Sequence, residues 1–231
     1  SDENVKNGKL VFQAVWKEIA YTISYDLAGG SLPTGKTNPT TFTINSKPMD
    51  LVQPKREGYT FEGWSGTDIN GKDTQVTVTA RPLKDRTYTA NWKENSYTIV
   101  FNVEGEVTRG EMKNIPLRYT QETTIPKNGY VCGGYKFVGW RTGGKKSEQK
   151  VYQPGDKVSR LCATNNGTVN LYPIWEPCEY TITFDYQTGN KREKVTCKYK
   201  ETYTFPTVNR LGWTFEGWSR SAGSTNVISY A

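Results

Sequence analysis

A seven-residue pattern, Gly-aromatic-x-Phe-x-Gly-Trp, occurs three times and constrains the fold more than any other feature of the sequence. Its copies span residues 58–64, 134–140 and 212–218, so they recur at a long and almost constant spacing. This period exceeds that of common solenoid repeats, and each copy therefore predicts one small domain in a tandem array. Within a copy the aromatic residues alternate, as the side chains on one face of a strand do. We interpret the motif as a core element, which indicates how the chain folds but identifies no ligand.

Aromatic residues are expected to fill the cores of these small domains. Hydrophobic residues make up only 35% of the 231, whereas aromatic residues reach 13%. Units of about 75 residues bury little surface, so large rings must supply much of each core. The predicted core residues are the rings of the motif together with the tryptophans that close the first two repeats: Tyr59, Phe61, Trp64, Trp92, Tyr135, Phe137, Trp140, Trp175, Trp213, Phe215 and Trp218.

Short alternating segments between turn signals predict a mostly β fold, with no long amphipathic helix. Residues 10–16 match residues 87–92, and Trp16 precedes Trp92 by the same interval that separates the first two motif copies. The predicted organisation is therefore a closing strand of a preceding repeat at 1–16, followed by repeats at 17–92, 93–175 and 176–231. The third repeat is expected to be truncated, because by the spacing of the first its closing strand would lie beyond residue 231.

The distribution of charge and the hydropathy of the sequence argue against nucleic acids and membranes as partners. The net charge is +7, but the excess basic residues are scattered, which favours a solvated surface over nucleic-acid binding. Contact with anionic polymers or glycans is the weaker alternative. No apolar run approaches the length of a membrane helix, about 18 residues or more, so membrane insertion is not expected.

Catalytic chemistry has little support in the sequence. The chain contains no histidine, which removes histidine-based triads and most zinc sites. Glu62 and Glu216 fall on the same motif position, where the second copy carries Val138, so this position is not catalytic. The segment 68–73 has the alternating oxygen groups of a calcium loop but reads as an Asn-Gly turn. No enzyme activity, metal or cofactor is predicted.

Four cysteines, at positions 132, 162, 178 and 197, form no Cys-x-x-Cys pair. A hairpin centred on residues 188 and 189 would bring Cys178 and Cys197 near one another across its two strands. We therefore hypothesise a Cys178–Cys197 disulfide and, less directly, a Cys132–Cys162 disulfide in an oxidising compartment. Reduced, buried thiols are the alternative.

The combined pattern resembles the Listeria–Bacteroides repeat, also called the internalin B-repeat. It consists of a Tyr-Thr-Ile start, a Gly-Gly turn, a Pro before the motif and a closing Tyr-x-Ala-x-Trp. The resemblance implies a small β-grasp-like (α+β, mostly β) unit, repeated in an elongated rod, on an extracellular bacterial surface or secreted protein. It supplies no catalytic residues. The second copy departs from the pattern by an insertion at 128–133 and by Pro173, and the third by Trp213.

Two functional hypotheses follow. The first is a non-catalytic stalk or spacer that also forms an adhesive region, with a protein or glycan on a host or neighbouring cell as partner. The second is a carbohydrate-binding module that stacks exposed aromatic rings on sugars. A further expectation concerns assembly: residues 5–16 of one copy could complete the unfinished third repeat of another, giving head-to-tail self-association.

Overall fold

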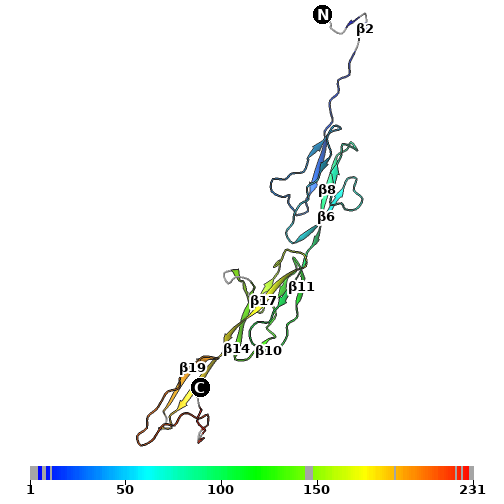
Figure 1. Cartoon of the computed structure of the whole chain (residues 1–231). Helices are drawn as coiled ribbons and strands as arrows, with labels where there is room; N and C mark the ends of the chain where they lie inside the picture. The colour runs from blue at the N-terminus through cyan, green and yellow to red at the C-terminus, as the bar shows by residue number, and fades with distance from the viewer. Residues whose placement is uncertain are drawn as a thin grey trace. The chain divides into compact units, whose positions relative to one another are not determined.

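The computed structural model describes residues 5–6, 9–10, 12–143, 148–189, 191–221, 223–224 and 226–228, with side chains described from residue 12 onward. Across these ranges the chain forms strands and loops, and no α-helix occurs (Figure 1). The mostly β fold predicted by the sequence is therefore confirmed. Strand lengths range from two residues to eleven, and turns that contain Gly, Pro, Asn or Asp separate many of the strands.

The chain divides into two compact units. One comprises Ser1–Val100, Lys113–Ile125 and Gly155–Asn170, and the other comprises Phe101–Met112, Pro126–Pro154 and Leu171–Ala231. The first unit contains the first sequence repeat and part of the second. The second unit contains the rest of the second repeat and the third.

The first repeat forms a four-stranded sheet in the order β4-β3-β8-β6. The central strand β8 pairs in parallel with β3 and antiparallel with β6. A separate two-stranded sheet joins β5 and β7. The strands of this repeat are β3 (Tyr21–Asp26), β4 (Thr41–Phe42), β5 (Met49–Asp50), β6 (Tyr59–Gly66), β7 (Thr77–Val78) and β8 (Arg86–Glu94).

The core of the first repeat surrounds Trp64, which is fully buried. Phe61 contacts both Trp64 and Trp92, with ring centroids 5.6 Å and 5.4 Å apart. A bulge between Phe61 and Gly63 shifts the register within β6. Because a bulge adds one residue to a strand, side chains after it change face. Phe61 and Trp64, three positions apart, can therefore both face the core.

The second repeat contributes a five-stranded sheet in the order β11-β9-β17-β14-β15. Its motif strand β14 carries the same bulge, between Phe137 and Gly139, and Trp140 is fully buried. The strands of this repeat are β9 (Ser96–Phe101), β10 (Val107–Arg109), β11 (Ile115–Arg118), β12 (Thr123–Thr124), β13 (Val131–Cys132), β14 (Tyr135–Thr142), β15 (Val151–Tyr152), β16 (Lys157–Val158) and β17 (Gly167–Pro177).

The third repeat contains the hairpin β18 (Glu179–Asp185) and β19 (Arg192–Lys198), which has the register predicted from its turn. Residues 212–218, expected as a motif strand, form no strand, although Trp218 packs against Phe184 with ring centroids 4.8 Å apart. At the other end, β1 (Val5–Lys6) pairs with β2 (Lys9–Leu10), and residues 12–20 form no strand. Both differences have one reason: neither segment has a neighbouring strand in the described part of the chain to complete its hydrogen bonds.

Candidate inter-repeat interface

The first repeat contacts the second around Gly58, within the first unit. We call this contact a clasp: two backbone hydrogen bonds through Asn95, and a tyrosine ring, Tyr119, that covers the glycine. The amide of Asn95 donates to the carbonyl of Gly58 at 2.9 Å, and the amide of Tyr119 donates to the carbonyl of Asn95 at 2.9 Å. The Tyr119 ring covers Gly58 so closely that a Cβ atom there would lie 2.0 Å from the ring. Tyr59 adds an edge-to-face contact with the same ring, with centroids 6.3 Å apart. Only glycine fits beneath this tyrosine.

The side chain of Asn95 closes the same junction. It is buried, so its amide must find hydrogen-bond partners within the protein. Its Nδ2 donates to the carbonyl of Ala163 at 2.7 Å, and its Oδ1 accepts from Thr60 Oγ1 at 2.6 Å. Asn95 therefore ties the motif strand of the first repeat to a loop of the second.

The second and third repeats meet in the same way, within the second unit. The amide of Cys178 donates to the carbonyl of Gly134 at 2.8 Å, and the amide of Tyr199 donates to the carbonyl of Cys178 at 2.9 Å. A Cβ atom on Gly134 would lie 2.4 Å from the Tyr199 ring. Tyr135 packs on this ring with centroids 5.4 Å apart. The clasp is thus repeated with Cys178 in place of Asn95.

Exposed polar contacts also form at each junction. Thr120 donates two hydrogen bonds to the carboxylate of Glu94, one from its hydroxyl and one from its backbone amide at 2.8 Å. Both lower the pKa of the Glu94 carboxyl, and the bond from the hydroxyl has the larger effect. Lys200 Nζ donates to the carboxylate of Glu106 at 2.6 Å, and this hydrogen bond raises the pKa of Lys200. The two contacts therefore respond to opposite ends of the pH range.

Counterparts of the clasp residues are exposed elsewhere in the chain. Phe42 pairs with Tyr21 in the first repeat, and Leu117 pairs with the equivalent Tyr97 in the second. Ile44 lies two residues after Phe42, and Tyr119 lies two residues after Leu117, so Ile44 is the counterpart of Tyr119. Ile19 stands two residues before Tyr21, as Asn95 does before Tyr97. Both isoleucines are exposed. Trp16, Ile19, Tyr21, Ile44 and Leu83 line one shallow surface hollow.

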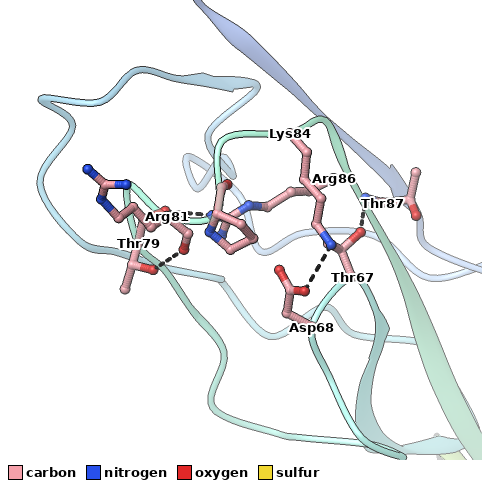
Figure 2. Close-up of polar contacts among 8 residues, drawn as sticks. Thr67, Asp68, Thr79, Arg81, Lys84, Arg86 and Thr87 are labelled. Carbon is pink, nitrogen blue, oxygen red and sulfur yellow. Dashed lines mark hydrogen bonds and ion pairs between the residues drawn. The ribbon is translucent and has the colours of Figure 1, made fainter.

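The loop that carries Leu83 is held in place by Arg86 and its neighbours (Figure 2). Arg86 is buried, and its guanidinium donates to the carbonyls of Thr79 and Pro82 at 2.8 Å and 3.1 Å. Lys84 Nζ forms an ion pair with Asp68 at 3.0 Å. These contacts hold the loop that carries Leu83 against the rest of the first repeat.

The motif residues predicted as core fall into three groups. Trp64 and Trp140 are fully buried, whereas most of the others are half-buried. Tyr59 and Tyr135 belong to the clasps, since each packs on a tyrosine of the next repeat. Trp213, at the same motif position, is 69% exposed and lies over Arg210 instead. Its expected burial is not observed, because the described part of the chain places no tyrosine against it.

Sequence reasoning missed Asn95, Tyr119 and Tyr199, which complete the clasps. In the structure, Tyr119 and Tyr199 each lie two residues after the residue that pairs with the first Tyr of their repeat, a correspondence that is visible only once the strands are paired. The first repeat has Ile44 at this position, which obscured the pattern.

The predicted disulfides are not formed, and all four cysteines are free. Cys197 lies opposite Tyr180, and Cys178 lies opposite Tyr199. Cys178 and Cys197 are therefore diagonal neighbours, which are about 7–8 Å apart in a sheet. This separation exceeds the usual Cα–Cα range of a disulfide, about 4.4–6.8 Å. Cys132 pairs with Val107 in a strand, while the Cys162 thiol faces the Thr164 carbonyl.

The residues of the calcium-like segment make other contacts. Asp68 pairs with Lys84, and Asp73 Oδ1 accepts from the amide of Gln75 at 2.9 Å. Among the described residues, no three Cys, Asp or Glu side chains gather as metal ligands would. The same residues include no helix with the length and apolar character needed to span a membrane.

Comparison with known proteins identifies the repeat. The profile of the Listeria-Bacteroides repeat domain matches residues 21–92, 97–172 and 180–230. The chain belongs to this family. Repeats of this family thus account for nearly all of the sequence, and the resemblance noted from the motif is confirmed.

Three relatives are similar over part of their length. A putative Gly-rich membrane protein of Evansella cellulosilytica is 24% identical over 93% of the chain and 27% of its own length. A putative membrane protein of the same organism is 26% identical over 90% of the chain and 29% of its length. Internalin H of Listeria monocytogenes is 31% identical over 55% of the chain and 22% of its length. The chain therefore spans less than a third of each relative.

Proposed function

We propose that this chain is a non-catalytic spacer segment of a bacterial cell-surface or secreted protein. Two kinds of observation support the proposal. The Listeria-Bacteroides repeats occur here in tandem, and relatives with similar sequence are named as membrane proteins and as an internalin. The absence of histidine and the exchange of Glu62 for Val138 at one motif position argue against catalysis.

The observation that carries the proposal is the repetition of the clasp. At both junctions an amide donates to a motif glycine carbonyl, and a tyrosine ring of the following repeat covers that glycine. The polypeptide connection is short as well, since β8 ends at Glu94 and β9 begins at Ser96. A junction with so little free chain and a filled contact limits the angles between neighbours, which is the property that a spacer requires.

Nuclear magnetic resonance of the aligned protein tests this function. Residual dipolar couplings from the amides of the first and second repeats should fit one common alignment tensor. The variant Tyr119→Ala should give two different tensors, because the cover over Gly58 is lost, while Lys36→Ala, an exposed change outside the junction, should keep one. Independent tensors in the unsubstituted chain would show that the repeats are flexibly linked and would contradict a spacer role.

A second role, adhesion to a protein or glycan on a host or neighbouring cell, has one favourable observation. Trp213 and Trp16 are both largely exposed, and exposed indole rings can stack on sugars. A carbohydrate module would show quenching or a shift of tryptophan fluorescence when oligosaccharides are titrated. The change should disappear in Trp213→Ala if this ring forms the site. An unchanged spectrum across neutral and acidic oligosaccharides would remove this alternative.

A further inference from the structure

An asparagine that precedes a glycine can react with the backbone of its own chain. Glycine has no Cβ atom, so its amide nitrogen can approach the side chain of the preceding asparagine with little steric hindrance. The chain contains such pairs at residues 7–8, 70–71, 128–129 and 166–167. The last three lie in the part of the chain that the structure describes. These three differ in the hydrogen bonds of the groups that would react.

The pair at 166–167 has its reacting groups held by hydrogen bonds. The amide of Gly167 donates to the carbonyl of Thr164 at 3.1 Å. The side chain of Asn166 accepts at Oδ1 from Ser96 Oγ at 3.0 Å, and its backbone amide donates to the Ser96 carbonyl at 2.7 Å. Both the nitrogen and the side chain must therefore give up hydrogen bonds before they can react.

The pair at 128–129 is held at both ends of the asparagine side chain. Asn128 Nδ2 donates to the carbonyl of Tyr130 at 2.8 Å, and Asn128 Oδ1 accepts from the amide of Tyr130 at 3.0 Å. The amide of Gly129 donates to Met112 Sγ at 3.1 Å. Tyr130 is itself buried, which anchors this turn in the core of the second repeat.

Asn70 and Gly71 have none of these restraints. Both residues are exposed, and no hydrogen bond joins either of them to another residue that the structure describes. Nothing lies within 4 Å of the place that a Cβ atom on Gly71 would take. The Gly71 amide and the Asn70 side chain can therefore rotate toward one another without losing a hydrogen bond or meeting a neighbour.

The turn is fixed on either side of this pair. Asp68, two residues before Asn70, forms an ion pair with Lys84 at 3.0 Å (Figure 2). Asp73 exchanges two backbone hydrogen bonds with Trp64, of 2.7 Å and 2.9 Å. Asn70 and Gly71 thus form a short free stretch between two fixed points. The fixed points keep the reacting groups in one short turn, and proximity of this kind favours an intramolecular step.

We propose that Asn70 is a site of spontaneous deamidation in the folded protein, whereas Asn128 and Asn166 are protected. The Gly71 amide nitrogen attacks Cγ of Asn70 and forms a C–N bond. The Cγ–Nδ2 bond breaks, and the side-chain nitrogen leaves as ammonia with the proton of the Gly71 amide. Water then opens the five-membered succinimide ring at either of its two carbonyl carbons. One opening gives aspartate, and the other gives isoaspartate, in which the main chain passes through the former side chain.

Either product changes the surface of the first repeat. A carboxylate replaces a neutral amide in a segment that already carries Asp68 and Asp73, so the turn becomes more acidic. Isoaspartate also lengthens the backbone by one methylene group between the two fixed points. The core around the buried Trp64 should be retained, because Asn70 and Gly71 are exposed and contribute no contact to it.

Peptide mapping by mass spectrometry over a time course at mildly alkaline pH tests the proposal on the full chain. Deamidation exchanges a side-chain NH2 for a hydroxyl, which each peptide reports by its mass, and the two isomeric products separate by chromatography. Asn70 should convert faster than Asn128 and Asn166 by about tenfold or more, the factor that corresponds to one net hydrogen bond. In denaturing urea the three rates should approach one another, because the restraints of the fold are removed.

Two glycine variants separate the local geometry from a general change in stability. Gly71→Ala should slow the conversion of Asn70, because a methyl group then hinders the attacking nitrogen. Gly35→Ala is the matched control and should leave the rate unchanged: its φ of +74° is close to the +81° of Gly71, and nothing lies within 4 Å of its Cβ position either.

Two results would overturn the proposal. One is conversion of Asn128 or Asn166 in the folded chain at a rate equal to that of Asn70. The other is an Asn70 that stays intact in the folded chain while it converts in urea, since the fold would then protect the pair that the structure leaves free.

Discussion

Gly58 occupies a position that allows no side chain, for two separate reasons. Its φ of +75° is unfavourable for other residues, and the Tyr119 ring lies where a Cβ atom would be. Gly35 has nearly the same φ, +74°, but nothing lies within 4 Å of its Cβ position. A comparison of substitutions at the two glycines therefore distinguishes the cost of backbone strain, which both share, from the cost of disturbing the Tyr119 contact, which only Gly58 has.

We expect Gly58→Ala to destabilise the first unit by more than Gly35→Ala does. Gly35→Ala should lower the free energy of unfolding by about 1–2 kcal/mol, the usual cost of the left-handed conformation. Gly58→Ala adds the cost of overpacking, about 1–3 kcal/mol. Urea denaturation followed by circular dichroism measures both. Equal losses would mean that the Tyr119 contact contributes nothing to stability.

Asn95→Ala should also weaken the first junction. It leaves the carbonyl of Ala163 without its amide donor and Thr60 without its acceptor, and such a loss at a buried site is worth about 1–3 kcal/mol. Asn70→Ala, at an exposed turn position, is the control and should change the free energy of unfolding little. Amide hydrogen exchange at Tyr119, whose amide donates to the Asn95 carbonyl, should accelerate in Asn95→Ala. An unchanged exchange rate of the Tyr119 amide in Asn95→Ala would show that Asn95 does not stabilise the first junction.

At the scale of strands, the sequence was sufficient for the motif strands of the first two repeats and for the hairpin of the third. The alternation of aromatic residues predicts β6 and β14, and the centre of the turn at 187–190 predicts the register of β18 with β19. It was insufficient where an element depends on a distant neighbour. Residues 212–218 carry the motif but form no strand, because a strand needs a partner that local alternation does not report. Tyr119 escaped notice for the same reason, since the glycine that it covers, Gly58, lies in the preceding repeat.

The contribution of the Glu94–Thr120 contact to the stability of the first junction should be lost in acid. The pKa of Glu94 is lowered, chiefly by the hydroxyl and amide of Thr120, so its contribution to stability is present above the ordinary carboxyl pKa of 4.5. It is lost as the pH falls through the lowered pKa of the folded protein. The carboxyl carbon shift of Glu94 should titrate below 4.5, and Glu94→Gln should remove this part of the acid dependence. Titration of Glu94 at or above 4.5 would contradict the contact.

The second junction should respond to alkali instead. The hydrogen bond to Glu106 raises the pKa of Lys200 above its ordinary value of 10.5. A raised pKa contributes stability that is present below 10.5 and is lost as the pH rises through the folded value. The Lys200 Cε carbon shift reports this titration, and Glu106→Gln should move it back toward 10.5. An unchanged midpoint in Glu106→Gln would show that the ion pair is not formed in solution.

The whole molecule behaves as a one-dimensional array if each repeat contacts only its neighbours in sequence. Such arrays have stabilities that combine a term for each repeat with a term for each junction. The two clasps supply the junction terms, and each lies within a single compact unit. A disturbance at one clasp should therefore reach the two repeats that share it and decline beyond them.

Gly134→Ala tests this expectation at the junction of the second and third repeats. A Cβ atom there would lie 2.4 Å from the Tyr199 ring, so exchange protection should fall in β14, β18 and β19. Protection in β3 and β8 of the first repeat should be unchanged. Gly155→Ala is the control, because its φ of +100° gives strain with nothing within 4 Å, and it should affect the second repeat without lowering protection in β19. A uniform fall in protection across all three repeats would instead make the molecule one cooperative unit, since the free energy of a single clasp would then be shared by every strand.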